Sequence, residues 1–545
     1  MSAVASNQKA SSHWIIIKLC KLYGVNPLTP TPLFSFQTFR RATMADASRP
    51  KTNHGGEPEP ARSSYVEPSS SSHQLEVEPL DPKLKARDRV FPLALLFCFA
   101  FLIRAGILLK NGGALQEDPD AYQAIAVTLS DQGVFGLTAS DGRVIPTSFR
   151  PPLYPAILSL LVDEGRGPHL FLIGCFHLLL GLLTVLFTYL AAQSITSPNL
   201  NHLTKHRIGL LAGCITTLDP ILVQQSTFAM TETLAAFLAS MIFWHWMKNR
   251  TGDSSPWRAG LTGGILLSLA YLCRPTFLVW AFLLLSHDLI EAVLASTRRS
   301  GHADRSVEWK KRQITQTLLS ASLVLLAVGL WTARNQRATG HPVWATTHGG
   351  YTLLLGNNPI FYEHLENQGM LTRWNAAEFT RAYTFRFGED GTDPEFWLAT
   401  RDQKMEPNLP DPNLTEHQDD QWSYAAAKAA ITNTPSTFVK ACLNRIYRLW
   451  TPIPFSTPDR SDVQRIVISI YYLGIYLAAI FGLCEMLKTV NWRAYWPAIS
   501  LVISLSVVHT FYWSNMRMRA PALPLIAIFA AQVYRPKFTK KIQQQ

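Results

Sequence analysis

Three carboxylates stand directly after the first long apolar run of the chain. This run, residues 91–109, carries a single charge at Arg104. The stretch EDPDAYQAIAVTL follows it, and its acidic residues are Glu117, Asp118 and Asp120. Carboxylates at the mouth of an apolar helix bundle could take the proton of an acceptor hydroxyl as general bases. A solvated loop would account for the same residues, so their role depends on the solvent around the apolar run.

Basic and acidic residues also stand at the ends of later apolar runs. An arginine between apolar runs is costly unless it faces a polar cavity or the membrane interface. A guanidinium can grip phosphate oxygens in a bidentate way, which makes these arginines candidate phosphate ligands. The candidates are Arg274, Arg334, Arg517 and Arg519. Anchoring at the interface is the alternative role. Glu232 opens an apolar run, where it would equally complement a helix dipole.

The composition predicts that these runs cross a membrane. Hydrophobic residues make up 48% of the 545 residues and charged residues only 16%, against roughly 25% charged residues in soluble proteins. The apolar blocks have about the length that crosses a hydrocarbon core of about 30 Å. We therefore expect an all-α polytopic membrane protein with about ten spans. They are 91–109, 170–194, 207–224, 231–247, 259–273, 275–290, 315–332, 464–486, 495–511 and 519–534.

Two of these assignments leave an alternative open. The intervals around Asp219–Pro220 and Arg274–Pro275 fit either a turn between two spans or a break within one.

The net charge of +12 does not indicate a nucleic-acid partner, because the basic residues gather in alternate loops. Such a distribution follows the positive-inside rule. It predicts cytoplasmic termini and places residues 117–120, Arg274 and the turn 515–519 on the outer side. The predicted parts are a disordered cytoplasmic tail 1–90, a catalytic membrane module 91–332 with its first outer loop 110–169, an extracytoplasmic segment 333–463, C-terminal spans 464–534 and a basic cytoplasmic tail 535–545. Met44 is an alternative start of the chain.

Several short patterns occur along the chain in a fixed order. The first is Asp118-x-x-x-Tyr122, followed by Arg150-Pro-Pro-Leu-Tyr154-Pro, Thr231–Glu232, Arg274–Pro275, GLWTARNQRATGHPVWATTHGGYTLLLGNNP and MRMRAPALPLIAI. In this order they resemble the glycosyltransferase-C superfamily, in the branch of the lipid A aminoarabinose transferase and the protein O-mannosyltransferases. The resemblance covers roughly residues 91–534.

This resemblance implies a transferase that takes a sugar from a polyprenyl-phosphate carrier and passes it, with inversion, to an acceptor on the outer side. It makes Asp118 the first candidate for the base and Asp120 the second, and it puts Glu232 in the same network. Arg150 joins the four arginines above as a donor-phosphate ligand. The predicted substrate-binding residues are Tyr122, Tyr154 and Asn357.

The residues alone leave other questions open. A secondary transporter or lipid-linked-sugar flippase would also show many spans, although no internal repeat of the kind that transporters carry is visible. The acceptor could be a lipid, a glycan or a protein. No metal-ligand spacing is visible, but the carboxylates could hold a divalent cation. We expect a bacterial inner membrane, or the endoplasmic reticulum in a eukaryote, with membrane lipids around the spans.

Overall fold

The computed structural model describes most of the chain between Pro82 and Tyr534. The described residues are 82–139, 141–163, 165, 167–195, 200–249, 255–294, 303–369, 371–384, 414–456, 460–488 and 494–534. The predicted basic tail 535–545 and the first 81 residues of the predicted disordered tail lie outside them. Residues 82–90, which belong to the predicted tail, are helical and form the start of the first described helix.

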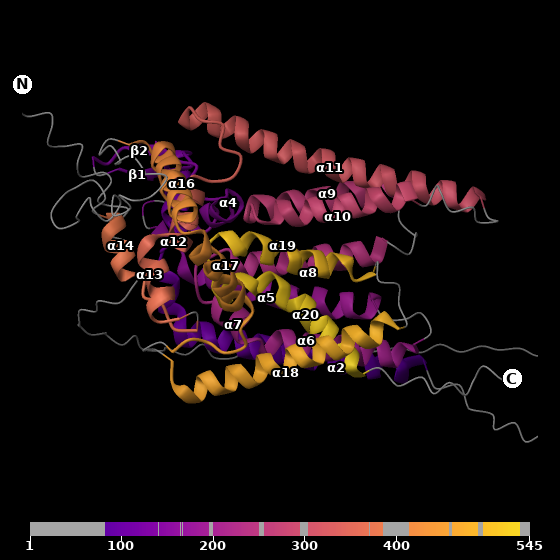
Figure 1. The fold of residues 1–545 in the computed structure, drawn as a ribbon. Coiled ribbons are helices and arrows are strands. Elements are labelled where there is room, and N and C mark those ends of the chain that lie inside the picture. The colour runs from indigo at the N-terminus through magenta and orange to yellow at the C-terminus, as the bar shows by residue number, and fades with distance from the viewer. Residues whose placement is uncertain are drawn as a thin grey trace, which may run out of the picture. The chain divides into compact units, whose positions relative to one another are not determined.

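The described residues are mostly helical (Figure 1). The membrane part and the C-terminal part contain α2 (Pro82–Asn111), α5 (Leu170–Ser194), α6 (His202–Leu218), α7 (Pro220–Gln225), α8 (Glu232–Asn249), α9 (Pro256–Cys273), α10 (Phe277–Leu294), α11 (Ala303–Thr339), α18 (Asp462–Leu487), α19 (Trp496–Phe511), η5 (Met516–Ala522), α20 (Leu523–Ala531) and η6 (Gln532–Tyr534). Every predicted span coincides with helical residues.

Five helices of the described residues are long and apolar enough to cross a membrane, which supports a multi-pass membrane protein. They cover Val90–Gln116, Leu170–Ser194, Phe277–Leu294, Glu308–Thr339 and Asp462–Leu487. The predicted number of ten is not confirmed, because other predicted spans are shorter or interrupted. The predicted span 519–534, for example, contains only nine α-helical residues, Leu523–Ala531, between two 3-10 segments.

The two ambiguous intervals are both breaks between helices. Asp219 ends α6 and caps α7, since its Oδ1 accepts the N–H groups of Ile221 and Leu222 at 3.0 Å each. Pro220 follows as the first residue of α7, where a missing N–H costs nothing. Arg274 ends α9 in an extended conformation, and α10 begins three residues later at Phe277. Each break leaves a charged side chain at a helix end.

Close helix packing positions the bundle that carries these ends. α9 lies along α11, and Figure 1 shows α10 beside both. Two glycines of α9 permit the close approach: a Cβ on Gly260 would lie 3.0 Å from the Cα of Gln316, and one on Gly264 would lie 2.9 Å from the Cα of Ser320. α5 packs against α6 and α8 around a large apolar core. α8 also packs against α9, and the N-terminal end of α8 meets the C-terminal end of α9, where Cys273 contacts the Thr231 carbonyl.

Short elements lie outside these helices. The first outer loop contains η2 (Gly112–Gln116), α3 (Tyr122–Gln132), α4 (Leu153–Ser159) and two antiparallel hairpins, β1 (Gly136–Thr138) with β2 (Val144–Pro146) and β3 (Val162–Asp163) with β4 (Gly167–Pro168). The segment predicted to be extracytoplasmic contains α12 (Gly349–Gly356), α13 (Pro359–Asn367), α14 (Ala377–Thr384), α16 (Glu416–Asn433) and α17 (Pro435–Trp450). It has an aromatic core of its own, which includes Phe361, Trp374 and Phe379.

Candidate active site

The two aspartates of the first outer loop hold the chain as it enters α3. Asp118 Oδ2 accepts the N–H of Ala124, the third residue of α3, at 2.8 Å. Between Asp118 and Ala124 the chain turns through Ala121 at a φ of +57°, a left-handed conformation that is rare for alanine. Asp120 is fixed by Arg150, whose Nη2 donates to Oδ1 and whose Nε donates to the Asp120 carbonyl, both at 2.7 Å. Both carboxylates are therefore held near one another at the start of α3.

Asp120 is ionised at neutral pH. Burial alone would raise the pKa of its carboxyl, but the guanidinium of Arg150, followed by that of Arg517, lowers the pKa below its usual range. Arg274 acts in the same direction. The Asp120–Arg150 pair thus lies within electrostatic reach of two arginines from the end of the helix bundle. Nearby, burial lowers the pKa of His348 well below its usual value, so its imidazole is neutral.

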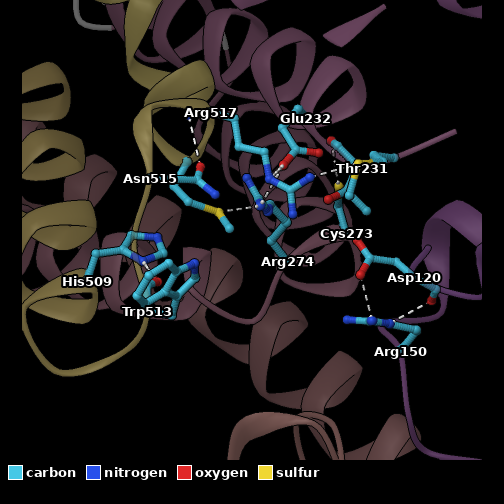
Figure 2. Close-up of polar contacts among 12 residues, drawn as sticks. Asp120, Arg150, Thr231, Glu232, Cys273, Arg274, His509, Trp513, Asn515 and Arg517 are labelled. Carbon is cyan, nitrogen blue, oxygen red and sulfur yellow. Dashed lines mark hydrogen bonds and ion pairs between the residues drawn. The ribbon is translucent and has the colours of Figure 1, made fainter. Parts of the chain in front are cut away.

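Glu232 is the centre of the second charged group. It is the first residue of α8, and its side chain is 2% exposed. Its Oε1 accepts a hydrogen bond from Nη2 of Arg274 at 3.4 Å and lies 3.6 Å from Nε of Arg517. Figure 2 shows both guanidinium groups around Glu232, with Asp120 and Arg150 to one side. The other oxygen, Oε2, has no hydrogen-bond partner among the described residues.

The arginines of this group also contact methionine sulfurs. Nη2 of Arg274 lies 3.4 Å from Sδ of Met518, and Nη1 of Arg517 lies 3.0 Å from Sδ of Met230. A thioether is a weak acceptor, whereas a phosphate oxygen forms short charge-assisted hydrogen bonds with a guanidinium. Both arginines can therefore exchange a sulfur contact for an anionic ligand at little cost. The Arg517 side chain is 34% exposed, so it is accessible to such a ligand.

Two buried tyrosines lie where the loop meets the bundle. The rings of Tyr122 and Tyr154 meet edge to face at 5.3 Å, and the Arg150 guanidinium lies 5.5 Å from the Tyr122 ring centre. The Tyr154 hydroxyl is 2.8 Å from Nε2 of His177, and Nδ1 of His177 is 2.9 Å from the Ser226 carbonyl. Because a carbonyl only accepts, Nδ1 carries the proton and Nε2 accepts from Tyr154. We did not predict His177, although a lone histidine within an apolar span was a visible signal.

Three predicted residues have other partners. Arg334 donates from Nη1 to the Thr147 carbonyl and from Nη2 to the Phe135 carbonyl, both at 2.6 Å. It thereby ties α11 to the β1–β2 hairpin.

The other two hold backbone groups further along the chain. Nη1 of Arg519 donates to the carbonyls of Leu449 at 3.0 Å and Thr451 at 2.7 Å. Asn357 is completely buried, and its amide donates to the Leu353 and Phe511 carbonyls at 2.8 Å and 2.9 Å. The geometry thus brings together Asp120, Arg150, Glu232, Arg274 and Arg517, with both tyrosines close by.

Among the described residues, side chains that could jointly hold a metal ion come together at His287, Asp288 and Glu291, at the opposite end of α10 from Arg274.

Comparison with known proteins gives one family match. Residues 167–341 match the family of dolichyl-phosphate-mannose-protein mannosyltransferases. The matched segment includes Glu232 and Arg274 but neither Asp118 nor Asp120. It confirms the resemblance predicted from the sequence, and the enzyme class that this resemblance implies is a glycosyltransferase. No curated protein matches the chain significantly.

Solved structures give weaker likenesses. The chain is 13% identical to an oligosaccharyltransferase of Archaeoglobus fulgidus in complex with zinc and sulfate, with 80% of this chain and 48% of that chain covered and a TM-score of 0.43. A structure of the archaeal oligosaccharyltransferase AglB from the same organism, in complex with an inhibitory peptide and a dolichol-phosphate, is 14% identical to this chain. The match covers 82% of this chain and 50% of that chain, with a TM-score of 0.44. ArnT of Cupriavidus metallidurans bound to undecaprenyl phosphate is 11% identical to this chain. The match covers 78% of this chain and 77% of that chain, with a TM-score of 0.32. The chain spans about half the length of the two archaeal structures. All three TM-scores are too low for a conclusion about this chain.

Proposed function

We propose that this chain is an integral-membrane glycosyltransferase that moves a sugar from a polyprenyl-phosphate carrier to an acceptor on the extracytoplasmic side, with inversion. The observation that carries the proposal is the pair Arg274 and Arg517, which share one buried carboxylate and each contact a methionine sulfur. The description of the matched family favours dolichyl-phosphate mannose as the donor and a protein as the acceptor. A lipid or glycan acceptor remains the alternative.

The proposed reaction is a direct displacement at the anomeric carbon. The acceptor oxygen forms a bond to this carbon while the bond to the carrier phosphate breaks, and the phosphate leaves with the electron pair. Arg274 and Arg517 stabilise the charge that develops on the phosphate oxygens, because cationic donors act most strongly where charge develops in the transition state. The acceptor proton passes to a carboxylate of the first outer loop.

Asp118 is the proposed base, and Asp120 is the proposed positioning group. Asp120 holds Arg150 through both its carboxylate and its backbone carbonyl, so its contacts keep the loop in shape. Asp118 accepts, with its Oδ2, the N–H of Ala124 in the first turn of α3. Both lie within electrostatic reach of the tyrosines, since the charge of Asp118 acts on Tyr154 and that of Asp120 acts on Tyr122. We further propose that Tyr122 and Tyr154 form a wall of the substrate-binding space.

The outward orientation of the site is part of the proposal. The basic residues Lys248 and Arg258 stand at the other ends of the helices that carry Glu232 and Arg274, as the positive-inside rule requires of cytoplasmic loops. Lys205 and Arg207 likewise stand at the start of α6, whose other end carries Asp219. The segment 333–463 then lies outside with the site, and the carrier tail lies in the membrane beside the bundle. Whether that membrane is the bacterial inner membrane or the endoplasmic reticulum depends on the host.

Reconstitution in proteoliposomes tests this function against a flippase. The purified chain is supplied with polyprenyl-phosphate mannose labelled in the sugar, together with an extract of candidate acceptors. A transferase releases unlabelled polyprenyl phosphate and moves the label to an acceptor, whereas a flippase moves the intact donor between leaflets. Movement of intact donor without cleavage would overturn the proposal.

A further inference from the structure

A second group of polar residues lies at the far end of the helix bundle. α8 extends about 25 Å from Glu232 to Asn249 at about 1.5 Å per residue. α10 begins three residues after Arg274, which contacts Glu232, and it runs in the same direction as α8, because Asn249 and Asp288 at the far ends of the two helices line one cavity. Near its C-terminal end, α10 carries His287, Asp288 and Glu291, which are 8%, 5% and 8% exposed. One potential ligand atom from each lies within 4.8 Å of the others. This cluster is too far from Glu232 to take part in sugar transfer.

The distances within the cluster fit a metal site. Nδ1 of His287 lies 3.3 Å from Oδ1 of Asp288, and Nε2 lies 3.4 Å from Oε1 of Glu291. Two ligands bound to one tetrahedral zinc ion at about 2.0–2.1 Å are roughly 3.3–3.4 Å apart. If Nδ1–H donates to Asp288, then Nε2 presents its lone pair toward Glu291. A carboxylate that orients a metal-binding histidine in this way is common around zinc.

The imidazole ring is also held in place by packing. It stacks on the ring of Trp496 at a centroid distance of 5.1 Å and an interplanar angle of 20°. The indole N–H of Trp496 donates to the Leu283 carbonyl at 3.2 Å, which fixes the tryptophan in turn. A ligand whose orientation is set before binding loses little entropy when the ion arrives.

A cavity of about 110 Å³ opens beside the cluster between α8, α9, α10 and α11. Its polar lining includes Asp288, Glu291, His245, Gln313, Gln316 and Thr317. Thr317 is 4% exposed, and its hydroxyl has no hydrogen-bond partner among the described residues. The side-chain nitrogen of Gln316 also has no hydrogen-bond partner among the described residues. The oxygen and nitrogen of this amide can exchange places by a flip of the side chain. The cavity can therefore supply oxygen ligands or hold metal-bound water.

The charges around the cavity also favour a cation. Two buried carboxylates, Asp288 and Glu291, face one arginine of the lining, Arg312. Buried carboxylates are costly unless positive charge accompanies them, so a divalent cation would be attracted to this place.

We propose that His287 and Glu291, oriented by Asp288, bind a divalent transition-metal ion of the zinc type. One imidazole with carboxylate oxygens suits zinc better than magnesium or calcium, which prefer oxygen ligands alone. Bound there, the ion links α10 to the cavity wall formed by α11. The site is structural and independent of the proposed transfer reaction.

Zinc content of the full-length protein tests this proposal. The chain is purified in detergent, stripped with a chelator, incubated with zinc sulfate, desalted and measured by mass spectrometry. We expect Glu291→Gln and His287→Ala each to retain about one zinc ion per chain less than the wild type does. Zinc should also raise the melting temperature of the wild type, and not that of either variant.

Matched controls separate this site from other histidines and carboxylates. His169→Ala removes a half-buried imidazole at the start of α5, and Glu485→Gln removes an exposed carboxylate of α18. Both should bind as much zinc as the wild type. Equal zinc content in the wild type and in Glu291→Gln would overturn the proposal, and so would a wild type that retains no zinc. Glu291→Gln decides alone if His287→Ala does not fold, because it preserves the size of the side chain.

Discussion

Two sets of charged residues bind different kinds of groups: those of the candidate active site, and those that hold the segment 333–463 in place. In the site, Arg274 and Arg517 face a carboxylate and two thioethers. In a second group, charged side chains bind mainly backbone groups and hydroxyls, and we call these residues the outer frame. The outer frame consists of Arg334, Glu416, Asp420, Arg445 and Arg519.

The outer frame joins segments that are distant in the sequence. Arg445 donates to the carbonyls of Gly356 and Thr510, the second at 2.7 Å. Glu416 accepts the Ser148 N–H at 3.0 Å and the hydroxyls of Thr147 and Thr347. Buried backbone groups need a partner permanently, so these side chains stabilise the fold and are not available to a substrate. Arg274 instead contacts a carboxylate and a thioether, so no carbonyl loses its partner when this arginine turns to a phosphate.

The largest effect should come from the proposed base. Asp118→Asn keeps an oxygen that accepts the Ala124 N–H but removes the basicity, so turnover should fall about 10²–10⁴-fold with donor binding nearly unchanged. Single-turnover transfer from a labelled polyprenyl-phosphate sugar measures it. Asp120→Asn should have a milder effect. Glu117→Gln is the matched control, since this exposed neighbour should be nearly silent. Wild-type turnover in both aspartate variants would make the loop a solvated connection.

A residue of the outer frame should affect stability and leave donor binding intact. Arg334→Met removes two hydrogen bonds to the carbonyls of Phe135 and Thr147. Hydrogen bonds of charged groups contribute about 1.5–3 kcal/mol each, so the melting temperature in detergent should fall clearly. Donor affinity of the folded fraction should stay the same. Weaker donor binding at unchanged stability would instead place Arg334 in the site and blur the comparison.

Asp420 should make the outer frame sensitive to pH. Burial raises the pKa of its carboxyl from 3.8 to about 6, although the hydrogen bond from the Gly350 N–H acts against this shift. The folded protein thus holds the proton more tightly than the unfolded chain. Its stabilising effect is complete below pH 3.8 and is lost as pH rises through about 6. Melting temperatures measured across this range should decline less in Asp420→Asn, and identical profiles would contradict the assignment.

The smallest effect should come from the residue that positions Tyr154. His177→Phe removes one hydrogen bond from the Tyr154 hydroxyl, a contribution of about 1 kcal/mol, or roughly a fivefold lower kcat. Tyr154→Phe should act similarly. Because both changes break the same contact, the double variant should be no slower than the slower single variant. Additive losses would mean that His177 acts on the site by another route.

Sequence patterns predicted where the helices lie better than how many cross the membrane. Long apolar runs and the positions of basic residues were sufficient for α2, α5 and α18, whose apolar residues form uninterrupted runs. The C-terminal span is different. Pro521 and Pro524 lie within it, and its first residues, 519–522, belong to the 3-10 segment η5. Local geometry of this kind depends on the packing of η5 against α8 and α17, which a one-dimensional pattern does not contain.

For the site, residue type predicted the candidates and tertiary structure separated them. Arg274, Arg334 and Arg519 all stand at predicted span ends, yet only Arg274 meets a carboxylate. Nothing near Arg334 in the sequence indicates that the carbonyls of a distant hairpin will face it. The methionines at positions 230 and 518 were missed for the same reason, because a thioether carries no signal until a guanidinium lies beside it.

The central claim is that Arg274 and Arg517 hold the phosphate of the donor. The most direct test compares the affinity of the purified protein for polyprenyl phosphate with that for polyprenol, which has the same tail and no phosphate. In Arg274→Met the ratio of the two affinities should fall about ten- to a hundredfold, the equivalent of one charge-assisted hydrogen bond. Arg143→Met, which removes an exposed arginine of the same outer loop, should keep the wild-type ratio. An unchanged ratio in Arg274→Met would contradict the account.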